Sequence, residues 1–109
     1  MPGLDELRAP LLALHKAVLA ADRRGVEKVH GQLTGAEYLQ LVQDKVRYGW
    51  LVPLTELVLA LDDDEDVRAR ARELLKPPRS STPFGRRYLS LMQRSPELVV
   101  AHRALTRLL

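Results

Sequence analysis

Hydrophobic residues recur at intervals of three and four along most of the chain, which is the spacing of amphipathic helices. The first segment carries the clearest such stripe, which consists of Leu4, Leu7, Leu11, Leu14, Val18 and Ala21. We expect a first helix that ends near Val29, just before Gly31. Because Pro10 lacks the N–H that a helix interior needs, this helix should begin near Arg8 or kink there.

Start signals divide the remainder of the chain into further helices. Four of these signals are an N-cap residue or a proline in a first turn, namely Thr34 with Glu37, Trp50 with Pro53, Thr82 with Pro83, and Ser95 with Pro96. The acidic run from Asp62 to Asp66 is a fifth, because carboxylates stabilise the positive end of a helix dipole. It predicts a helix from about Asp64 to Leu75. The second helix should end near Gly49.

The composition indicates how these helices are held together. Of the 109 residues, 46% are hydrophobic but only 5% are aromatic, so the core must consist mainly of Leu, Val and Ala. Such an interior is typical of helix bundles. The sequence therefore predicts an all-α fold, a single compact bundle of five or six helices over residues 1–109, with a flexible loop near residues 76–82 where Pro and Ser collect.

Charge is distributed unevenly along the chain. Residues 1–66 contain 7 Lys/Arg and 12 Asp/Glu, whereas residues 67–109 contain 10 Lys/Arg and 2 Asp/Glu. This contrast has two interpretations: a basic surface for an anionic partner, or two halves of one bundle whose opposite charges face each other. The second is favoured, because the basic residues are spread through helical patterns.

Two patterns resemble metal sites and neither is complete. Glu27 and His30 have the Glu-x-x-His spacing of di-iron bundles, but the chain contains no second copy of it. Acidic residues also match several positions of a calcium loop, namely Asp62, Asp64, Asp66 and Glu73. Val67 stands where such a loop needs Gly, so we interpret the acidic run as helix capping. We expect no metal and no cofactor.

Nothing in the chain has the local pattern of an enzyme active site. Cysteine is absent, the serines lack a Gly-x-Ser-x-Gly context, and there is no glycine-rich phosphate loop. The sequence therefore favours a non-catalytic role over an enzyme, with no catalytic residues assigned. The lack of cysteine, of a secretory signal and of a long apolar run predicts a cytoplasmic protein without membrane contact.

Two segments resemble a family of small uncharacterised bacterial all-helical proteins. Residues 48–57 are similar to the pattern aromatic-x-Trp-Leu-x-Pro-Leu-Ser-Glu-Leu, with Thr55 where Ser is usual, and residues 88–102 are similar to a pattern that begins Tyr-x-x-Leu-x-Gln-x-x-Pro and ends Ala-His. The resemblance carries no known activity. It implies only that five residues act jointly, namely Trp50, Pro53, Glu56, Tyr88 and His102.

The resulting functional hypothesis is a helical interaction module that binds a protein partner or forms a homodimer. The apolar helix after Trp50 carries more Leu and Val than one shielded side requires, which favours a partner helix. Two alternatives stay open: binding of nucleic acid or an acidic partner by the basic 67–109 surface, and a small-molecule or metal-binding bundle. The predicted binding residues are Arg86, Arg87, Trp50, Tyr88 and His102.

Overall fold

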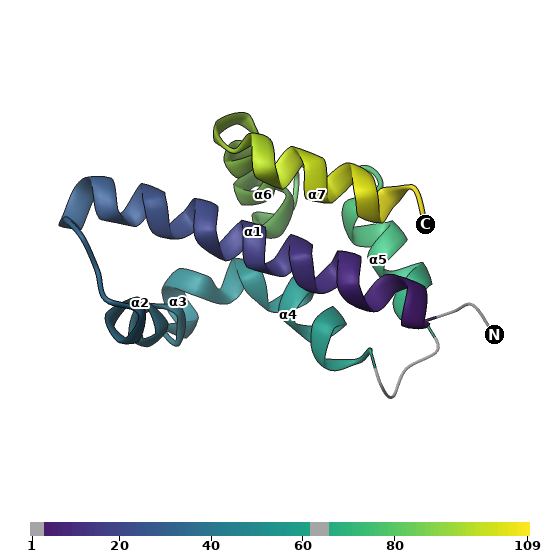
Figure 1. The fold of residues 1–109 in the computed structure, drawn as a ribbon, viewed down its shortest axis with the longest axis horizontal. Coiled ribbons are helices and arrows are strands. Elements are labelled where there is room, and N and C mark those ends of the chain that lie inside the picture. The colour runs from purple at the N-terminus through teal and green to yellow at the C-terminus, as the bar shows by residue number, and fades with distance from the viewer. Residues whose placement is uncertain (1–3, 62–65) are drawn as a thin grey trace.

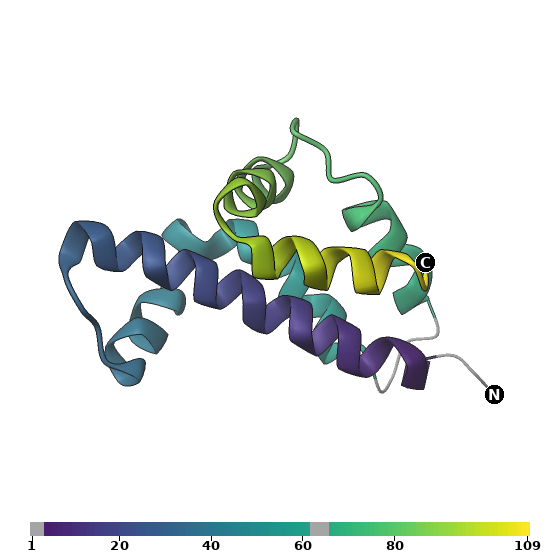
Figure 2. The same ribbon diagram turned by 45° about the horizontal axis from the view of Figure 1, so that its top comes forward.

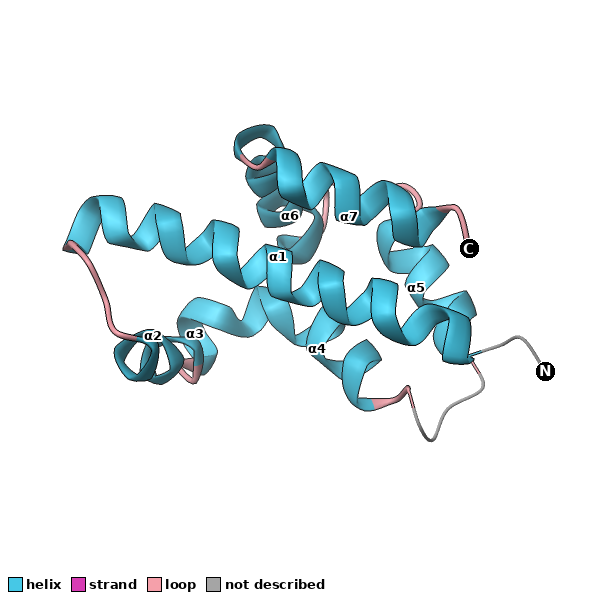
Figure 3. Cartoon of the chain, viewed as in Figure 1, coloured by secondary structure: helices cyan, strands magenta, loops and turns pink. Residues whose placement is uncertain are grey.

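A computed structural model describes residues 4–61 and 66–109, and these residues form helices joined by short loops (Figures 1 and 3). Six helices of eight or more residues occur in this part of the chain: α1 (Leu4–His30), α2 (Gly35–Val42), α4 (Val52–Leu59), α5 (Val67–Leu75), α6 (Pro83–Arg94) and α7 (Pro96–Thr106). Two shorter turns link α2 to α4, namely α3 (Lys45–Tyr48) and the 3-10 helix η1 (Gly49–Leu51). The described residues contain no strand, and the predicted all-α fold is confirmed.

The long helix α1 is the axis on which the other helices pack. In Figure 1 α7 lies along one side of α1 and α4 along the other, while α2 and α3 lie beside its C-terminal end. When the molecule is turned, α6 is seen above the second half of α1 and α5 beside its first half (Figure 2). The molecule measures 45 × 26 × 23 Å. The four helices α4, α5, α6 and α7 therefore pack directly on α1.

Leucine supplies most of the core. On α1 the predicted stripe is buried at Leu7, Leu11, Leu14, Val18 and Ala21. The other helices contribute Leu51, Leu54, Leu57, Leu61, Val67, Ala71, Leu75, Phe84, Tyr88, Leu91, Leu98 and Leu105. Burying each of the Leu, Val and Phe side chains contributes roughly 1.5–3 kcal/mol.

Three of the predicted helix starts have the expected hydrogen bonds. The capping box at α2 is complete, since Glu37 N–H donates to Thr34 Oγ1 and Thr34 N–H donates to Glu37 Oε1, each over 3.1 Å. Thr82 Oγ1 accepts the Gly85 N–H at 2.9 Å, and Ser95 Oγ accepts an N–H in the same way at the start of α7. Each such cap contributes about 1 kcal/mol to helix stability.

Of the two alternatives predicted for Pro10, a helix start or a kink near Arg8, the start does not occur. The helix begins at Leu4 and continues through Pro10, so it does not start near Arg8. Proline removes one backbone hydrogen bond, but Leu7 and Leu11 on either side of it are buried at 1% and 0% exposure. Tertiary packing of an amphipathic face outweighs local propensity in such a case.

The predicted second helix is divided in two. It ends at Val42, and α3 begins after Asp44, whose carboxylate accepts the Arg47 N–H at 3.4 Å and whose carbonyl accepts the Tyr48 N–H at 2.9 Å. Asp favours helix starts over helix interiors, because its short side chain bonds to nearby backbone N–H groups. The break turns the chain so that Tyr48 faces α1.

The start of the fourth helix can be compared with the prediction only in part. The helix α5 begins at Val67, and Asp66 occupies its N-cap position without a side-chain capping bond. Residues 62–65 lie outside the described residues, so the predicted acidic first turn and the calcium-loop pattern cannot be followed there.

Gly85 is fixed by a close approach of the loop before α6. A Cβ atom added at Gly85 would lie 1.7 Å from the carbonyl oxygen of Arg79. The same carbonyl accepts the Thr82 N–H at 3.1 Å, so the loop folds back on the first turn of α6. Only glycine fits this contact, so Gly85 allows the loop to pack against the first turn of α6.

Candidate functional site

The site is built around Asp22, a carboxylate on the inner face of α1 that is only 1% exposed. Its Oδ2 atom accepts hydrogen bonds from the hydroxyls of Tyr38 at 2.8 Å and Tyr48 at 2.7 Å. Its Oδ1 atom accepts one from Arg87 Nη2 at 3.0 Å. Asp22 thus joins α1 to α2, α3 and α6.

Burial of this carboxylate is compensated by its three donors. An isolated buried carboxylate is unstable, whereas one that is paired and fully hydrogen-bonded is tolerated. Within residues 4–61 and 66–109 no buried side-chain nitrogen or oxygen lacks a hydrogen-bond partner. Burial, followed by the bond to Asp22, raises the pKa of both tyrosine hydroxyls, which stay protonated as donors.

The loop between α1 and α2 is held by two hydrogen bonds to the backbone of Leu33. The Leu33 carbonyl accepts a hydrogen bond from Arg23 Nη2 at 2.6 Å, and its N–H donates to Glu27 Oε2 at 2.8 Å. Arg23 also lies 5.9 Å over the ring of Tyr38. Glu27 therefore has a structural role here, and this loop fixes where α2 and its tyrosine lie.

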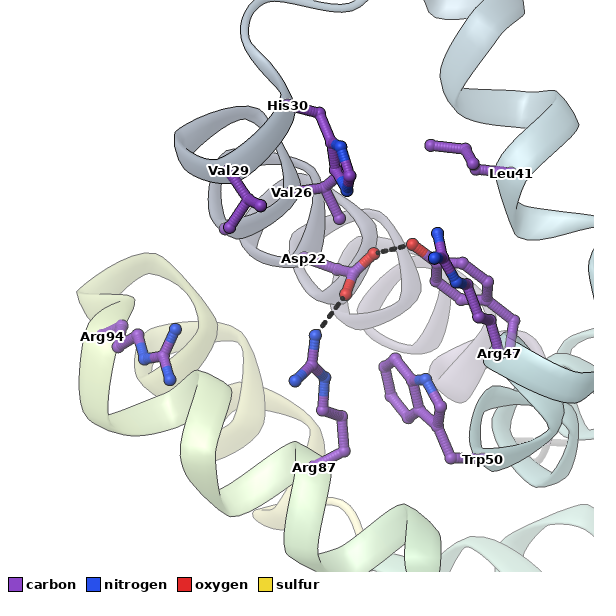
Figure 4. A pocket seen from close by; sticks show the side chains of 11 residues that line it. Asp22, Val26, Val29, His30, Leu41, Arg47, Trp50, Arg87 and Arg94 are labelled. Carbon is purple, nitrogen blue, oxygen red and sulfur yellow. Dashed lines mark hydrogen bonds and ion pairs between the residues drawn. The ribbon is translucent and has the colours of Figure 1, made fainter.

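A pocket of about 480 Å³ opens beside Asp22, at the junction of α1, α3, η1 and α6 (Figure 4). Ligand pockets are typically about 300–1,000 Å³. The lining side chains include four basic residues, namely His30, Arg47, Arg87 and Arg94. Figure 4 shows these four side chains around the open space, with Arg87 directed at the Asp22 carboxylate.

The three guanidinium groups of the pocket differ in what they already bind. Arg87 is paired with Asp22 at 3.0 Å, so its charge is compensated. Arg94 Nη2 makes one long contact of 3.4 Å, with the hydroxyl of Ser90. Within the described part of the chain neither Arg47 nor Arg94 forms an ion pair. The pocket therefore carries two uncompensated arginine charges.

The rest of the wall is apolar and, at one side, aromatic. Val26, Val29 and Leu41 line the pocket together with Trp50. The Arg87 guanidinium lies 5.8 Å from the centre of the Trp50 ring, a cation–π geometry. Because Asp22 and Trp50 both contact Arg87, this guanidinium is held in place before any ligand arrives.

A row of aromatic rings runs from the pocket to His102 on α7. Ring centres are 6.2 Å apart for Tyr48 and Trp50, 6.5 Å for Trp50 and Phe84, and 5.1 Å for Phe84 and Tyr88. Tyr88 then reaches His102 at 5.5 Å. The row fixes the Trp50 ring at the pocket from its buried side.

The five predicted binding residues are brought together only in part. Trp50 and Arg87 line the pocket, whereas Arg86 lines a separate shallow depression that also includes Trp50 and Arg87. Tyr88 is fully buried, and its hydroxyl lies 2.7 Å from His102 Nδ1. Burial lowers the pKa of His102 and raises that of Tyr88, so a neutral pair is favoured in the core.

The remaining residues of the family resemblance lie elsewhere. Pro53 and Glu56 line another depression between α4 and α5, and Glu56 forms an ion pair with Arg70 at 4.0 Å. Their joint action with Trp50, Tyr88 and His102 stays a prediction.

The three histidines lie at three different places. His15 bonds to Thr55 Oγ1 at 3.2 Å, and burial lowers the pKa of His15. His102 pairs with Tyr88, and His30 is at the pocket rim. Among the described residues no three His, Asp or Glu side chains gather closely enough to hold a metal ion.

The acidic and basic halves of the sequence face each other at several places. Arg87 pairs with Asp22 at 3.0 Å, and Arg68 pairs with Glu6 at 3.7 Å. Arg72 binds the carbonyl of Leu109 through two nitrogens. Much of the basic charge of residues 67–109 is thus used within the fold.

Sequence reasoning missed the centre of the site, although one signal was present. Asp22 lies four residues after Val18 and four before Val26, so it falls on the buried stripe of α1. A carboxylate at a core position demands donors from other helices. Arg47 was not predicted, and Arg94 was considered only as part of the basic 67–109 surface, because only the fold brings these two segments to one pocket.

Comparisons with protein-family models, with curated proteins and with solved structures found no match to this chain. The resemblance to small bacterial helical proteins stays a prediction. No described helix combines the length and the apolar character that crossing a membrane requires. The pocket is therefore the observation on which a functional proposal rests.

Proposed function

We propose that this chain is a non-catalytic interaction module that binds an acidic segment of a partner protein in the pocket beside Asp22. The observation that carries this proposal is the pair of uncompensated guanidinium groups, Arg47 and Arg94, on the wall of a single pocket. Arginine presents a planar fork of donors that matches carboxylate and phosphate oxygens.

The apolar wall supports a peptide as the occupant. Val26, Val29 and Leu41 offer aliphatic surface beside the charges, so a segment that alternates acidic and apolar side chains meets complementary groups. Val29 is 78% exposed, so part of this apolar wall is open to a partner. Both kinds of contact favour a peptide over a purely charged ligand.

Nucleic acid is the weaker candidate, because the basic residues do not form one continuous face. A duplex presents one charge per about 1.7 Å of its axis, so it needs an extended basic surface. Here Arg68 and Arg72 bind backbone carbonyls near the C-terminal end, while Arg87 is compensated by Asp22.

The non-catalytic character rests on the state of Asp22. Its two oxygens already accept three hydrogen bonds, and the carboxylate is 1% exposed. A general base must reach the proton that it removes. Asp22 therefore holds the pocket together and positions Arg87, which supports binding more than chemistry.

Fluorescence anisotropy with a labelled twelve-residue peptide of alternating Glu and Leu tests this proposal, with a twelve-residue oligothymidine as the competing probe. The peptide should bind and the affinity should fall with salt. Arg47→Glu plus Arg94→Glu should weaken binding by roughly 100-fold, since charge-assisted hydrogen bonds contribute about 1.5–3 kcal/mol each.

The matched control is Arg103→Glu plus Arg107→Glu, which makes the same charge change at two exposed residues at the C-terminal end. It should leave peptide binding within about threefold, because these residues lie outside the pocket. Equal losses in both double variants, or preferred binding of the oligothymidine, would contradict the proposal.

A second copy of this chain is the other protein partner to test. Residues 1–66 have a net negative charge and the pocket is basic, so one copy offers groups that another can bind. Light scattering during size-exclusion chromatography distinguishes a second copy of this chain from a different protein as the partner. A dimer that dissociates in the Arg47→Glu plus Arg94→Glu variant would make the partner a second copy, and a monomer would leave it a different protein.

A further inference from the structure

A second surface lies along the outer side of α1 and α4, away from the pocket. The two helices pack on each other and run in opposite directions (Figure 1). The bond of 3.2 Å between His15 Nε2 and Thr55 Oγ1 fixes which turns lie side by side. Within about one helical turn of this bond lie four aliphatic side chains that are not fully buried, namely Leu12, Leu19, Val52 and Leu59. Together with Lys16 and Glu56 we call them the α1–α4 face.

The two helices of this face repeat one pattern with opposite charges. The pattern is Leu12-x-x-His15-Lys16-x-x-Leu19 on α1 and Val52-x-x-Thr55-Glu56-x-x-Leu59 on α4. Residues three or four apart share one side of a helix, so on each helix the charged residue lies between the two aliphatic ones. The α1–α4 face is thus apolar at both ends, with one positive and one negative charge in the middle.

The side chains of the face are open to a partner. Leu59 is 72% exposed and Val52 is 45% exposed, and these are the residues by which α4 exceeds the apolar surface that one shielded side requires. Within the described part of the chain Lys16 forms no ion pair, and Glu56 has one long contact of 4.0 Å with Arg70. Exposed apolar side chains that are flanked by polar ones are typical of interaction surfaces.

We propose that the α1–α4 face is the interface of a homodimer, in which α1 of each copy lies on α4 of the other. A two-fold axis that runs along the face, between the two helices, produces this arrangement. Lys16 and Glu56 each directly follow a residue of the bond between His15 and Thr55, so they lie at nearly the same level of the face.

The charges explain why the partner is a second copy. In the two-fold arrangement Lys16 of each copy meets Glu56 of the other, and the aliphatic residues of one copy lie on those of the other. Opposite charges at such positions between paired helices determine partner choice. The α1–α4 face is therefore complementary in charge to itself.

The inference goes beyond the proposed function and does not depend on it. None of the six described residues of the α1–α4 face lines the pocket beside Asp22, so each copy in the dimer keeps an open pocket. Four aliphatic side chains per copy make a small interface, and small interfaces are weak. The dimer should therefore form only as the protein concentration rises.

Sedimentation velocity of the full chain over a range of concentrations tests the inference. Lys16→Glu alone and Glu56→Lys alone should each weaken dimerisation by about tenfold or more, because each places like charges opposite each other. An equimolar mixture of the two variants should dimerise to within about threefold of the unaltered chain. One variant then has two negative charges on its face and the other has two positive charges, so every opposed pair is again attractive.

Matched variants separate this face from the rest of the surface. Lys28→Glu makes the same charge change elsewhere on α1 and should leave dimerisation unchanged. Leu59→Ser should weaken the dimer by about tenfold, because it removes apolar surface from both halves of the interface. Val100→Ser, at a residue of α7 that is 67% exposed, should have no such effect. Circular dichroism checks that each variant is folded.

Three results would overturn the inference: a chain that stays monomeric at every concentration, a dimer that both single charge variants keep, or a mixture of these variants that stays monomeric. Arg47→Glu plus Arg94→Glu should lose the acidic peptide and keep the dimer. A monomeric chain that still binds the acidic peptide would contradict the dimer alone, so the failure of this inference is distinguishable from the failure of the proposed function.

Discussion

The two ends of α1 lie in opposite chemical environments. Around its first half the neighbours are α4, α5 and α7, and the buried side chains there are aliphatic, including Leu7, Leu11, Leu14, Leu57, Leu75 and Leu105; we call this the leucine end. Around its second half Asp22, Tyr38 and Tyr48 are buried, and Asp22 is paired with the exposed Arg87; we call this the polar end.

The difference shows how one helix serves stability and binding at once. Aliphatic packing is non-directional, so the leucine end holds the bundle together without fixing any donor or acceptor. Hydrogen bonds are directional, so the polar end specifies where Tyr48 and Arg87 lie. The pocket occurs at the polar end, where a precise arrangement of charges is required.

Asp22→Ala should be the most damaging change at the polar end, with a loss of roughly 3–5 kcal/mol in the free energy of unfolding. It leaves two tyrosine hydroxyls and one guanidinium without their shared acceptor. Urea denaturation followed by circular dichroism measures the loss. A cost below about 1 kcal/mol would mean that the three bonds to Asp22 contribute little net stability.

Leu11→Ala should cost about 2–5 kcal/mol at the leucine end, because it opens a cavity at a fully buried position. The neighbouring Leu12→Ala is the matched control, since Leu12 is 44% exposed and its loss leaves no internal cavity. Urea denaturation of both variants at low and high salt measures the loss of stability and shows whether it depends on charge. The Leu11 effect should not change with salt, and similar costs for the two leucines would contradict the assignment of the core.

Tyr38→Phe should lower the free energy of unfolding by about 1–2 kcal/mol, and its effect should be confined to α2. The hydroxyl of Tyr38 lies 2.8 Å from Asp22 Oδ2 and 3.0 Å from the Leu19 carbonyl, and these bonds hold the short helix α2 on α1. Hydrogen exchange should show faster opening of α2 amides and unchanged exchange at the leucine end. Leu39→Ala, at a residue that is 60% exposed, should leave exchange unchanged.

The smallest expected effect is a loss of stability with acid from two histidines outside the pocket. Burial lowers the pKa of His15 and His102 below the value of 6.5 expected in the unfolded chain. The unfolded chain then binds more protons, so this contribution is complete above pH 6.5 and is lost as pH falls through the lowered pKa values.

Thermal unfolding between pH 7.5 and pH 5 measures this effect. The double variant His15→Gln plus His102→Asn should have a flatter dependence on pH, because both titrating groups are removed while each position keeps a polar side chain. An equally steep dependence in the variant would assign the acid sensitivity to other groups.

The local features of the fold could be predicted from sequence, because they depend on residues a few positions apart. Thr34 with Glu37, Thr82 and Ser95 begin helices as their spacing indicates, and the α1 stripe marks its buried face. Pro10 left two alternatives open, and the helix start near Arg8 does not occur, since a local rule about one missing N–H does not include packing on the rest of the bundle.

The candidate site could not be predicted in the same way. Arg47 and Arg94 are 47 positions apart, and neither has a local signal that distinguishes it from an ordinary surface arginine. Trp50 and Arg87 were predicted separately, but their contact follows from how α6 packs on η1. Asp22 was the one member that its own position could have identified, as a charged residue within an apolar stripe.

The most direct test of binding in the pocket is a two-dimensional NMR titration of the ¹⁵N-labelled chain with the twelve-residue peptide of alternating Glu and Leu. Trp50 is the only tryptophan, so its indole N–H gives a single signal at the pocket. We expect this signal and the side-chain N–H signals of Arg47, Arg87 and Arg94 to shift first. Shifts confined to Arg103 and Arg107, with the Trp50 signal unchanged, would place binding on α7 and contradict the central claim.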